Sequence, residues 1–146
     1  MKFRTIIDKT LEEEVIIHAK ERTSIVEELE SFIANVDTEL IGYTESKRIV
    51  KLRPADVHCF TVEDGKTYAL TDKEKLQLRQ RLYVLEEMLD ESFVKINQSC
   101  IGNVSKIKCF DASLGGALMV SFKCGHRDYV SRRQLKTVKE RIGFKL

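Results

Sequence analysis

The sequence has few of the residues, and none of the low-complexity runs, that are typical of long disordered tails. Its 146 residues include only one proline and seven glycines, with no low-complexity run and no internal repeat. With 42% hydrophobic residues, the chain has enough apolar material for one core and too little length for two ordinary domains. We therefore expect one globular domain with at most an appended element.

Long hydrophobic runs are also missing. No apolar stretch approaches the roughly 20 residues that a membrane-spanning helix needs, and the start MKFRTIIDKTLEEE lacks the apolar region and cleavage site of a secretion signal. An even number of cysteines would suit two disulfides, but without that signal buried free thiols are the better interpretation. We expect a cytoplasmic protein with four free cysteines: Cys59, Cys100, Cys109 and Cys124.

Signals for catalysis or metal binding are few. There is no CxxC and no HxxxH, and the close Cys and His neighbours are only His58-Cys59 and Cys124-Gly125-His126. A zinc site assembled in space remains open, although structural zinc sites usually contain tight ligand pairs. The loop SLGGAL, residues 113–118, lacks the GK[ST] of a phosphate-binding loop and reads as a turn. The sequence predicts no enzyme, catalytic residue, metal, cofactor or small-molecule substrate.

Charge is divided unevenly along the chain. Residues 1–92 contain 14 Lys and Arg against 20 Asp and Glu, a balance of −6, whereas residues 93–146 contain 11 against 3, a balance of +8. The basic part is either a solvated face without a partner or an electrostatic footprint for a polyanion. Charge alone favours neither.

The first 39 residues are predicted to form an appended element. KFRTII and EVIIHAK are typical of two short strands, and Ser24 with Glu27 has the spacing of a capping box. A helix from Ser24 to Val36 would follow, acidic on one face. This helix either packs on the domain or serves in dimerisation or docking. Its apolar face would hold Ile25, Leu29, Phe32, Ile33 and Val36.

From Leu40 the sequence indicates antiparallel strands broken by turns at Arg53-Pro54, Asp64-Gly65 and Asp72-Lys73. A capping-box spacing at Thr71 and Glu74 competes with a strand at residues 75–79, and the alternation there favours the strand. A short helix follows, its apolar stripe formed by Leu82, Leu85 and Met88 or Leu89.

Strands then resume with FVKIN, CIGNVSKIKCFDA, ALMVSFKC and RDYV, with turns at SLGG and Gly125. The last element, SRRQLKTVKERIG, is predicted to be a basic helix from Ser131, with Gln134 completing a capping box and Gly143 ending it. Its inward residues would be Leu135, Val138 and Ile142.

The segment after Phe93 contains the residue types that read DNA. Asn and Gln bind an adenine edge and Arg a guanine edge, which suits Asn97, Gln98, Arg132 and Arg133. Lysines suit phosphates, where charge matters more than geometry, and the candidates are Lys95, Lys106, Lys136 and Lys139. Taken singly, each is equally well explained as an ordinary surface residue.

The order of these pieces resembles the LytTR family of bacterial DNA-binding domains. FVKINQSCIGNVSKIK is similar to that family's core motif, and YVSRRQLKTVKERIG is similar to its closing strand and terminal helix. The resemblance runs from Leu40 to the C-terminus and divides the chain into an extension, 1–39, and a DNA-binding domain, 40–146.

The resemblance implies a mainly β fold with short helices, in which elongated antiparallel strands carry loops into the major groove. It implies a transcriptional regulator that binds promoter repeats as a homodimer, of a stand-alone type without a receiver domain. Control could come from abundance, dimerisation or a membrane-bound partner. A protein-interaction module and a small RNA-binding protein are the rivals. The family's DNA contacts would fall on Lys66, Lys95, Asn97, Gln98, Ser99, Arg132 and Arg133. Lys136 joins these candidates as a phosphate contact because of its charge.

Overall fold

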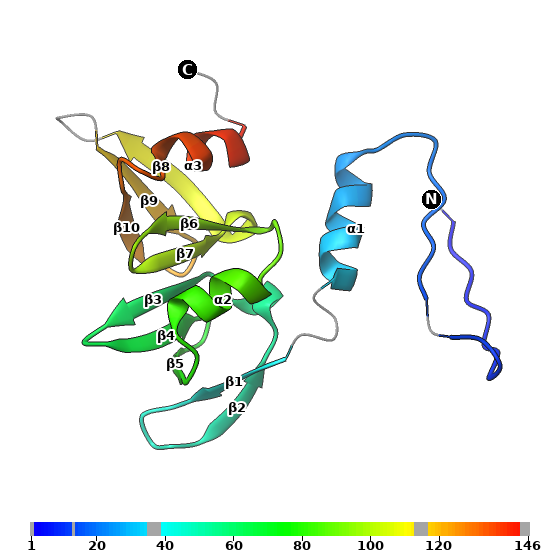
Figure 1. Cartoon of the computed structure of the whole chain (residues 1–146), viewed down its shortest axis with the longest axis horizontal. Coiled ribbons are helices and arrows are strands. Elements are labelled where there is room, and N and C mark those ends of the chain that lie inside the picture. Colours follow the sequence, from blue (N-terminus) through cyan, green and yellow to red (C-terminus); the bar gives the residue numbers. More distant parts are fainter. Residues whose placement is uncertain (1, 13, 35–38, 113–116, 144–146) are drawn as a thin grey trace.

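The computed structural model describes residues 2–12, 14–34, 39–112 and 117–143. Within them the chain forms ten strands, three α-helices and two short 3-10 turns, and every strand pairing is antiparallel (Figure 1). The prediction of a mainly β fold with short helices is confirmed.

Seven strands form the larger sheet, in the order β2-β1-β5-β4-β3-β7-β6. Consecutive strands mostly lie next to each other, as expected where short turns join antiparallel neighbours. The strands are β1 Leu40–Tyr43, β2 Ile49–Leu52, β3 Cys59–Glu63, β4 Lys66–Leu70, β5 Lys75–Leu78, β6 Phe93–Asn97 and β7 Cys100–Asn103.

Three strands form the second sheet, in the order β10-β9-β8. The chain enters it from β7 through a 3-10 turn at Val104–Lys106, which Asn103 holds. Its side-chain oxygen accepts from the N–H of Ser105 (3.1 Å), and its amide donates to the carbonyl of Val57 (2.9 Å). The strands are β8 Ile107–Ala112, β9 Leu118–Phe122 and β10 Arg127–Val130.

The two faces of the larger sheet bury two separate cores. Along β7, Ile101 belongs to the core with Phe60, and Cys100 to the core with Phe122, because successive side chains of a strand point to opposite faces. Helix α2, Leu82–Met88, contacts β3 and β7 and covers the first core. The second sheet and helix α3, Leu135–Arg141, contain the residues of the second core.

The predicted turns and strand of the middle segment are confirmed. Asp64 and Gly65 have φ values of 50° and 75° between β3 and β4, the left-handed conformation that a tight hairpin turn requires. Thr71 accepts from the N–H of Glu74 (3.1 Å), as a capping residue would, but it closes the turn before β5 instead of starting a helix.

The helices α2 and α3 match the predictions in part. In α2, Leu82 and Leu85 are buried and Leu89 follows them, whereas Met88 is 43% exposed. Helix α3 ends before Gly143, whose φ is 72°, but it begins at Leu135, four residues later than predicted. Residues 131–134 form a turn, and the SLGG turn lies outside the described residues.

The prediction of two strands before the first helix is wrong. Residues 2–12 and 14–22 form no strand, and their apolar side chains, such as Phe3 at 94%, are largely exposed. Two short segments alone bury too little surface to stabilise a hairpin in water.

Helix α1, Ser24–Ala34, also differs from the sequence pattern. Thr23 lies at its start, its hydroxyl 3.4 Å from the N–H of Val26, in place of Ser24. Val26 is buried and lies with residues 2–6 and 14–19 around one hollow, whereas Ile25 and Phe32 are more than half exposed. Leu29 and Ile33 line the same hollow, as predicted, so the buried face includes Val26 in place of Ile25 and Phe32. The last predicted member, Val36, lies outside the described residues.

All four cysteines are free, as predicted. Cys59 and Cys100 are buried and Cys124 is half-buried, but Cys109 is exposed on β8. Hydrogen bonding to Cys59 and burial together raise the pKa of the Cys100 thiol well above its ordinary value. None of the helices in the described part of the chain is long and apolar enough to span a membrane.

Candidate nucleic-acid interface

Three connections of the chain meet at one end of the strands. They are the β3–β4 turn at residues 63–66, the β6–β7 turn at residues 98–99, and the link from β10 to α3 at residues 131–134. The turns of both hairpins lie on the left of Figure 1. We call these three segments the loop edge.

Two backbone hydrogen bonds place the three segments beside one another. The N–H of Val62 donates to the carbonyl of Ser99 (2.9 Å), which joins the β3–β4 hairpin to the β6–β7 turn. The N–H of Ser131 donates to the carbonyl of Ile96 (3.0 Å), which brings the β10–α3 link to the end of β6. Segments that are far apart in sequence thus form one surface.

Asn97 lies beneath the loop edge and not on it. Its side chain is 1% exposed. Its amide donates to Asp128 Oδ1 (2.8 Å) and to the carbonyl of Tyr129 (2.8 Å), while its oxygen accepts from the N–H of Ser99 (2.8 Å). The expectation that Asn97 is held out toward a groove is therefore wrong, because both of its donors are used inside the protein. It fastens the β6–β7 turn to β10.

Asp128 is the partner that the sequence did not reveal. Its Oδ1 also accepts from the N–H of Tyr129 (2.9 Å). Burial raises the pKa of this carboxyl group, but hydrogen bonds from His126, Asn97 and the backbone outweigh burial and leave the pKa below its ordinary value. No local pattern could have indicated this contact, because the two side chains are 31 residues apart.

Gln98 and Ser99 form the exposed tip of the β6–β7 turn. With Asn97 fixed below, the turn presents an amide and a hydroxyl to solvent. These groups can both donate and accept hydrogen bonds, as base edges and phosphates require.

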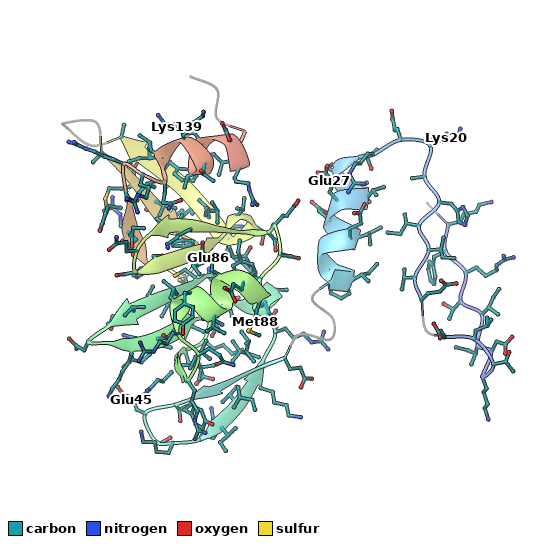
Figure 2. The ribbon with its side chains drawn as sticks, in the orientation of Figure 1. Lys20, Glu27, Glu45, Glu86, Met88 and Lys139 are labelled. Carbon is teal, nitrogen blue, oxygen red and sulfur yellow. The ribbon has the colours of Figure 1, made fainter. Side chains whose placement is uncertain are left out.

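Arg132, Arg133 and Lys136 are all exposed. The two arginines lie in the turn that precedes α3, and Lys136 lies in the first turn of the helix. None of the three forms an ion pair with a described residue. Their charges are therefore available to a partner. Lys139, one helical turn after Lys136, projects from the same helix (Figure 2).

Lys66 is the first residue of β4, directly opposite Glu63 across the hairpin. The carboxylate of Glu63 already pairs with Lys75, whose ammonium group also lies 4.4 Å from the ring centroid of Tyr68. Lys66 itself is exposed at the tip of the hairpin.

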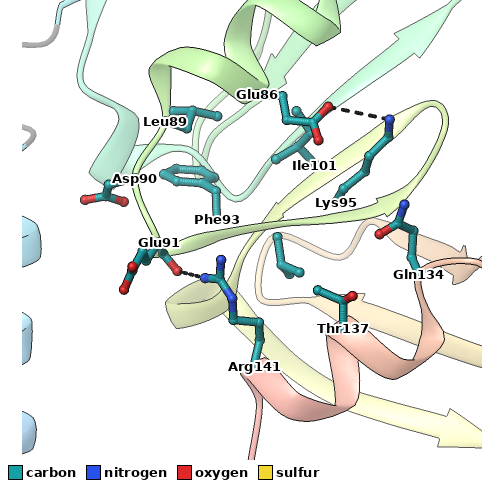
Figure 3. Close-up of a pocket in the computed structure, with 11 residues that line it drawn as sticks. Glu86, Leu89, Asp90, Glu91, Phe93, Lys95, Ile101, Gln134, Thr137 and Arg141 are labelled. Carbon is teal, nitrogen blue, oxygen red and sulfur yellow. Dashed lines mark hydrogen bonds and ion pairs between the residues drawn. The ribbon is translucent and has the colours of Figure 1, made fainter.

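Lys95 has a different environment. It lies on β6, and its ammonium group is 3.5 Å from Glu86 of α2 (Figure 3). Both residues line a hollow of about 320 Å³ together with Gln134. Lys95 would have to break its ion pair with Glu86 before it could contact a phosphate. Breaking a partly exposed ion pair costs about 0–1 kcal/mol. Lys106 is farther still, because it follows β7 at the end opposite to the loop edge.

An antiparallel β domain with basic and amide side chains on its connecting loops is suited to bind nucleic acid through loops. Comparison with known proteins identifies the class further: the model of the LytTr DNA-binding domain matches residues 47–143. The chain belongs to the LytTR family of DNA-binding domains.

The chain is also similar to transcriptional regulators, and its fold is similar to that of a solved LytTr domain. An uncharacterized HTH-type transcriptional regulator of Staphylococcus aureus strain MSSA476 is 32% identical over 99% of both chains, and its counterpart in strain NCTC 8325 is equally similar. The LytTr DNA-binding domain of a Bacillus cereus protein described as a methyl-accepting/DNA response regulator superimposes with a TM-score of 0.66. That match is 22% identical and covers 73% of this chain and 97% of the domain.

The helix-turn-helix in the relatives' description does not fit this fold. In the described residues, strands separate α1 from α2 and α2 from α3, so no two helices follow each other through a short turn. A helix-turn-helix protein places its second helix in the major groove. Here the side chains suited to DNA lie instead mainly on turns.

Proposed function

We propose that this protein is a transcriptional regulator that binds duplex DNA sequence-specifically by inserting the loop edge into the major groove. The observation that carries the proposal is the convergence of three exposed turns at one end of the sheets, each with a side chain able to bind DNA. Membership of a family of DNA-binding domains supports DNA as the polymer that is bound. The relatives' descriptions support a role in regulation.

The residues on and beside the loop edge are proposed to have three roles. Gln98, Arg133, Arg132 and Lys66 are exposed at turns and are proposed to read base edges. Ser99, Lys136 and Lys95 are proposed to contact the phosphate backbone, which fixes orientation without reading sequence. Asn97 is proposed to act indirectly, by holding the turn that carries Gln98.

The extension, residues 1–39, is proposed to join two copies of the chain. The family match starts at residue 47, but the staphylococcal relatives align over 99% of both chains and so share the extension. It exposes six large apolar side chains, each at least 64% accessible, and such patches usually mark interaction sites. They are Phe3, Ile6, Ile7, Leu11, Val15 and Ile16.

A DNA titration across a salt series tests the function. The protein would first be incubated with random genomic fragments, and the fragments that it retains would be sequenced to define a site. Affinity for that site should fall with salt, with a slope of about −0.9 in log–log form for each phosphate contacted. A slope near zero, or equal affinity for a scrambled site, would contradict the proposal.

The same assay separates the rivals. Proteins that bind single-stranded RNA usually stack bases on exposed aromatics. Phe93 and Phe122 are buried and cannot stack on bases, and Tyr129 of β10, at 54% exposed, is one aromatic where RNA-binding sheets stack two or three bases. Duplex DNA should therefore compete far better than single-stranded RNA. Binding to neither polymer would favour a protein-interaction module with a solvated basic face.

A further inference from the structure

Two thiols and one imidazole come together inside the molecule, away from the exposed turns. Cys59 lies on β3, Cys100 on β7 and His126 in the turn between β9 and β10. One ligand atom of each, the two sulfurs and a ring nitrogen, lies within 4.8 Å of the other two. Both cysteines are buried and the histidine is half-buried.

The dimensions and chemistry of this cluster suit a tetrahedral metal ion. Zinc binds thiolate sulfur at about 2.3 Å and imidazole nitrogen at about 2.0–2.1 Å, which puts neighbouring ligands about 3.3–3.8 Å apart. The three atoms need to move by about an ångström or less to reach that spacing. Thiolates with imidazole select zinc-like ions over magnesium or calcium, which prefer oxygen. Two thiolates also neutralise a divalent cation, so that no net charge is buried.

Two neighbouring groups complete the site. Thr61 is 3% exposed, and its hydroxyl has no hydrogen-bond partner among the described residues. It is directly opposite Cys100 in the sheet, on the same face as Cys59. A metal-bound water in the fourth position would satisfy it. Oδ2 of Asp128 lies 3.4 Å from Nε2 of His126, where a carboxylate can orient a metal-bound imidazole.

We propose that Cys59, Cys100 and His126 form a binding site for one divalent transition-metal ion of the zinc class, with a water in the fourth position. The ion joins the larger sheet, through β3 and β7, to the second sheet through the β9–β10 turn. Because Cys100 follows Ser99 and Asp128 holds Asn97, bound metal also stabilises the base of the loop edge. Only this last effect rests on the proposed function.

The test uses the full chain, reduced and stripped of metal with a chelator. Cobalt(II) is titrated first, because thiolate coordination produces charge-transfer bands, and zinc is then added to displace it. Wild-type protein should bind one equivalent, show the bands and gain thermal stability with zinc, as any ligand of the native state provides. The matched control Cys109→Ser removes the exposed thiol on β8 and should behave like wild type.

Two variants should lose the site. Cys100→Ser and His126→Gln are expected to weaken metal binding at least tenfold and to abolish the zinc-dependent rise in the melting temperature. His126 is only half-buried, so His126→Gln should fold even if Cys100→Ser does not. Folded wild-type protein without charge-transfer bands, or a His126→Gln variant that binds as tightly as wild type, would overturn the proposal. No DNA is present, so the result does not depend on the proposed function.

Discussion

At the β6–β7 turn, two consecutive amide side chains have opposite environments. Asn97 is 1% exposed with three hydrogen bonds, whereas Gln98 is exposed at the tip. The amide group of Asn97 therefore stabilises the fold, whereas the amide group of Gln98 is available to a partner.

Exchanging each amide for alanine should separate these roles. Asn97→Ala removes the donor to the carbonyl of Tyr129, one of the donors to Asp128 and the acceptor of the Ser99 N–H, which should cost about 1–3 kcal/mol in the free energy of unfolding. Gln98→Ala should change stability by less than about 0.5 kcal/mol and weaken binding to the cognate site. Urea denaturation and DNA titration of both variants measure the two effects. Equal loss of stability in both would contradict the assignment.

Arg133 is proposed to read a base, whereas Lys139, which follows Lys136 on α3, is expected to contact a phosphate. Arg133→Ala should lose discrimination at one base pair by about 1–3 kcal/mol, since a bidentate contact to guanine is removed. Lys139→Ala should weaken cognate and scrambled DNA alike and make the salt slope shallower by about one unit. Binding to a set of single-base variants of the site gives both quantities. A uniform loss for Arg133→Ala would make it a phosphate contact.

Residue chemistry could be predicted from the sequence more readily than residue placement. The sequence shows directly that residues 95–99 and 131–136 include basic and amide side chains. The structure confirms the predicted exposure of Gln98, Ser99, Arg132 and Arg133. The burial of Asn97 was missed because its partner Asp128 is distant in sequence. The cluster of Cys59, Cys100 and His126 was missed for the same reason.

Among the elements, prediction succeeded where the local signal is backed by tertiary packing. β6 and the Asp64-Gly65 hairpin match the predicted strand and turn, because each lies in the larger sheet and contributes to a core. The prediction of one strand over CIGNVSKIKCFDA is wrong, because the 3-10 turn at Val104–Lys106 divides it into β7 of the larger sheet and β8 of the second sheet. The two predicted N-terminal strands also contain β-branched residues, but in the described residues they have no sheet to join. Residue types that favour strands do not by themselves stabilise one.

The contact between the two sheets depends on a missing side chain at Gly102 of β7. A Cβ there would lie 2.8 Å from Cζ of Phe122 and 3.2 Å from Cγ1 of Ile96. Phe122 is 1% exposed and packed in the core, so its ring cannot move aside freely. Gly102→Ala should therefore destabilise the domain by about 1–3 kcal/mol through overpacking.

A double-mutant cycle in chemical denaturation identifies the cause. Phe122→Leu removes the atoms that the new methyl group would strike, so the double variant should be more stable than the sum of the single effects predicts. Additive effects would mean that Gly102 is needed for another reason.

Across the whole molecule, charge and apolar exposure are separated. The segment after Phe93 has the balance of +8 and contains two of the three turns of the loop edge, while the first 92 residues are net acidic. The exposed apolar side chains of the extension belong to residues N-terminal to α1, and that segment of the chain runs on the far side of the helix from the sheets (Figure 1). If two copies associate through their extensions, as proposed, this arrangement leaves the loop edges uncovered.

Polar substitution within the extension tests that arrangement. Phe3 and Ile7 are 94% and 87% exposed and make little contribution to the folded domain, so Phe3→Ser with Ile7→Ser should leave the melting temperature unchanged. If these side chains form the dimer contact, sedimentation velocity should show a dimer for wild type and for the control Lys9→Ser, and a monomer for the double variant. On DNA with two copies of the site, the double variant should bind each independently and lose the gain that linked sites provide. A monomeric wild-type protein would contradict the proposed dimer. A double variant that remains dimeric would show that the dimer contact lies elsewhere.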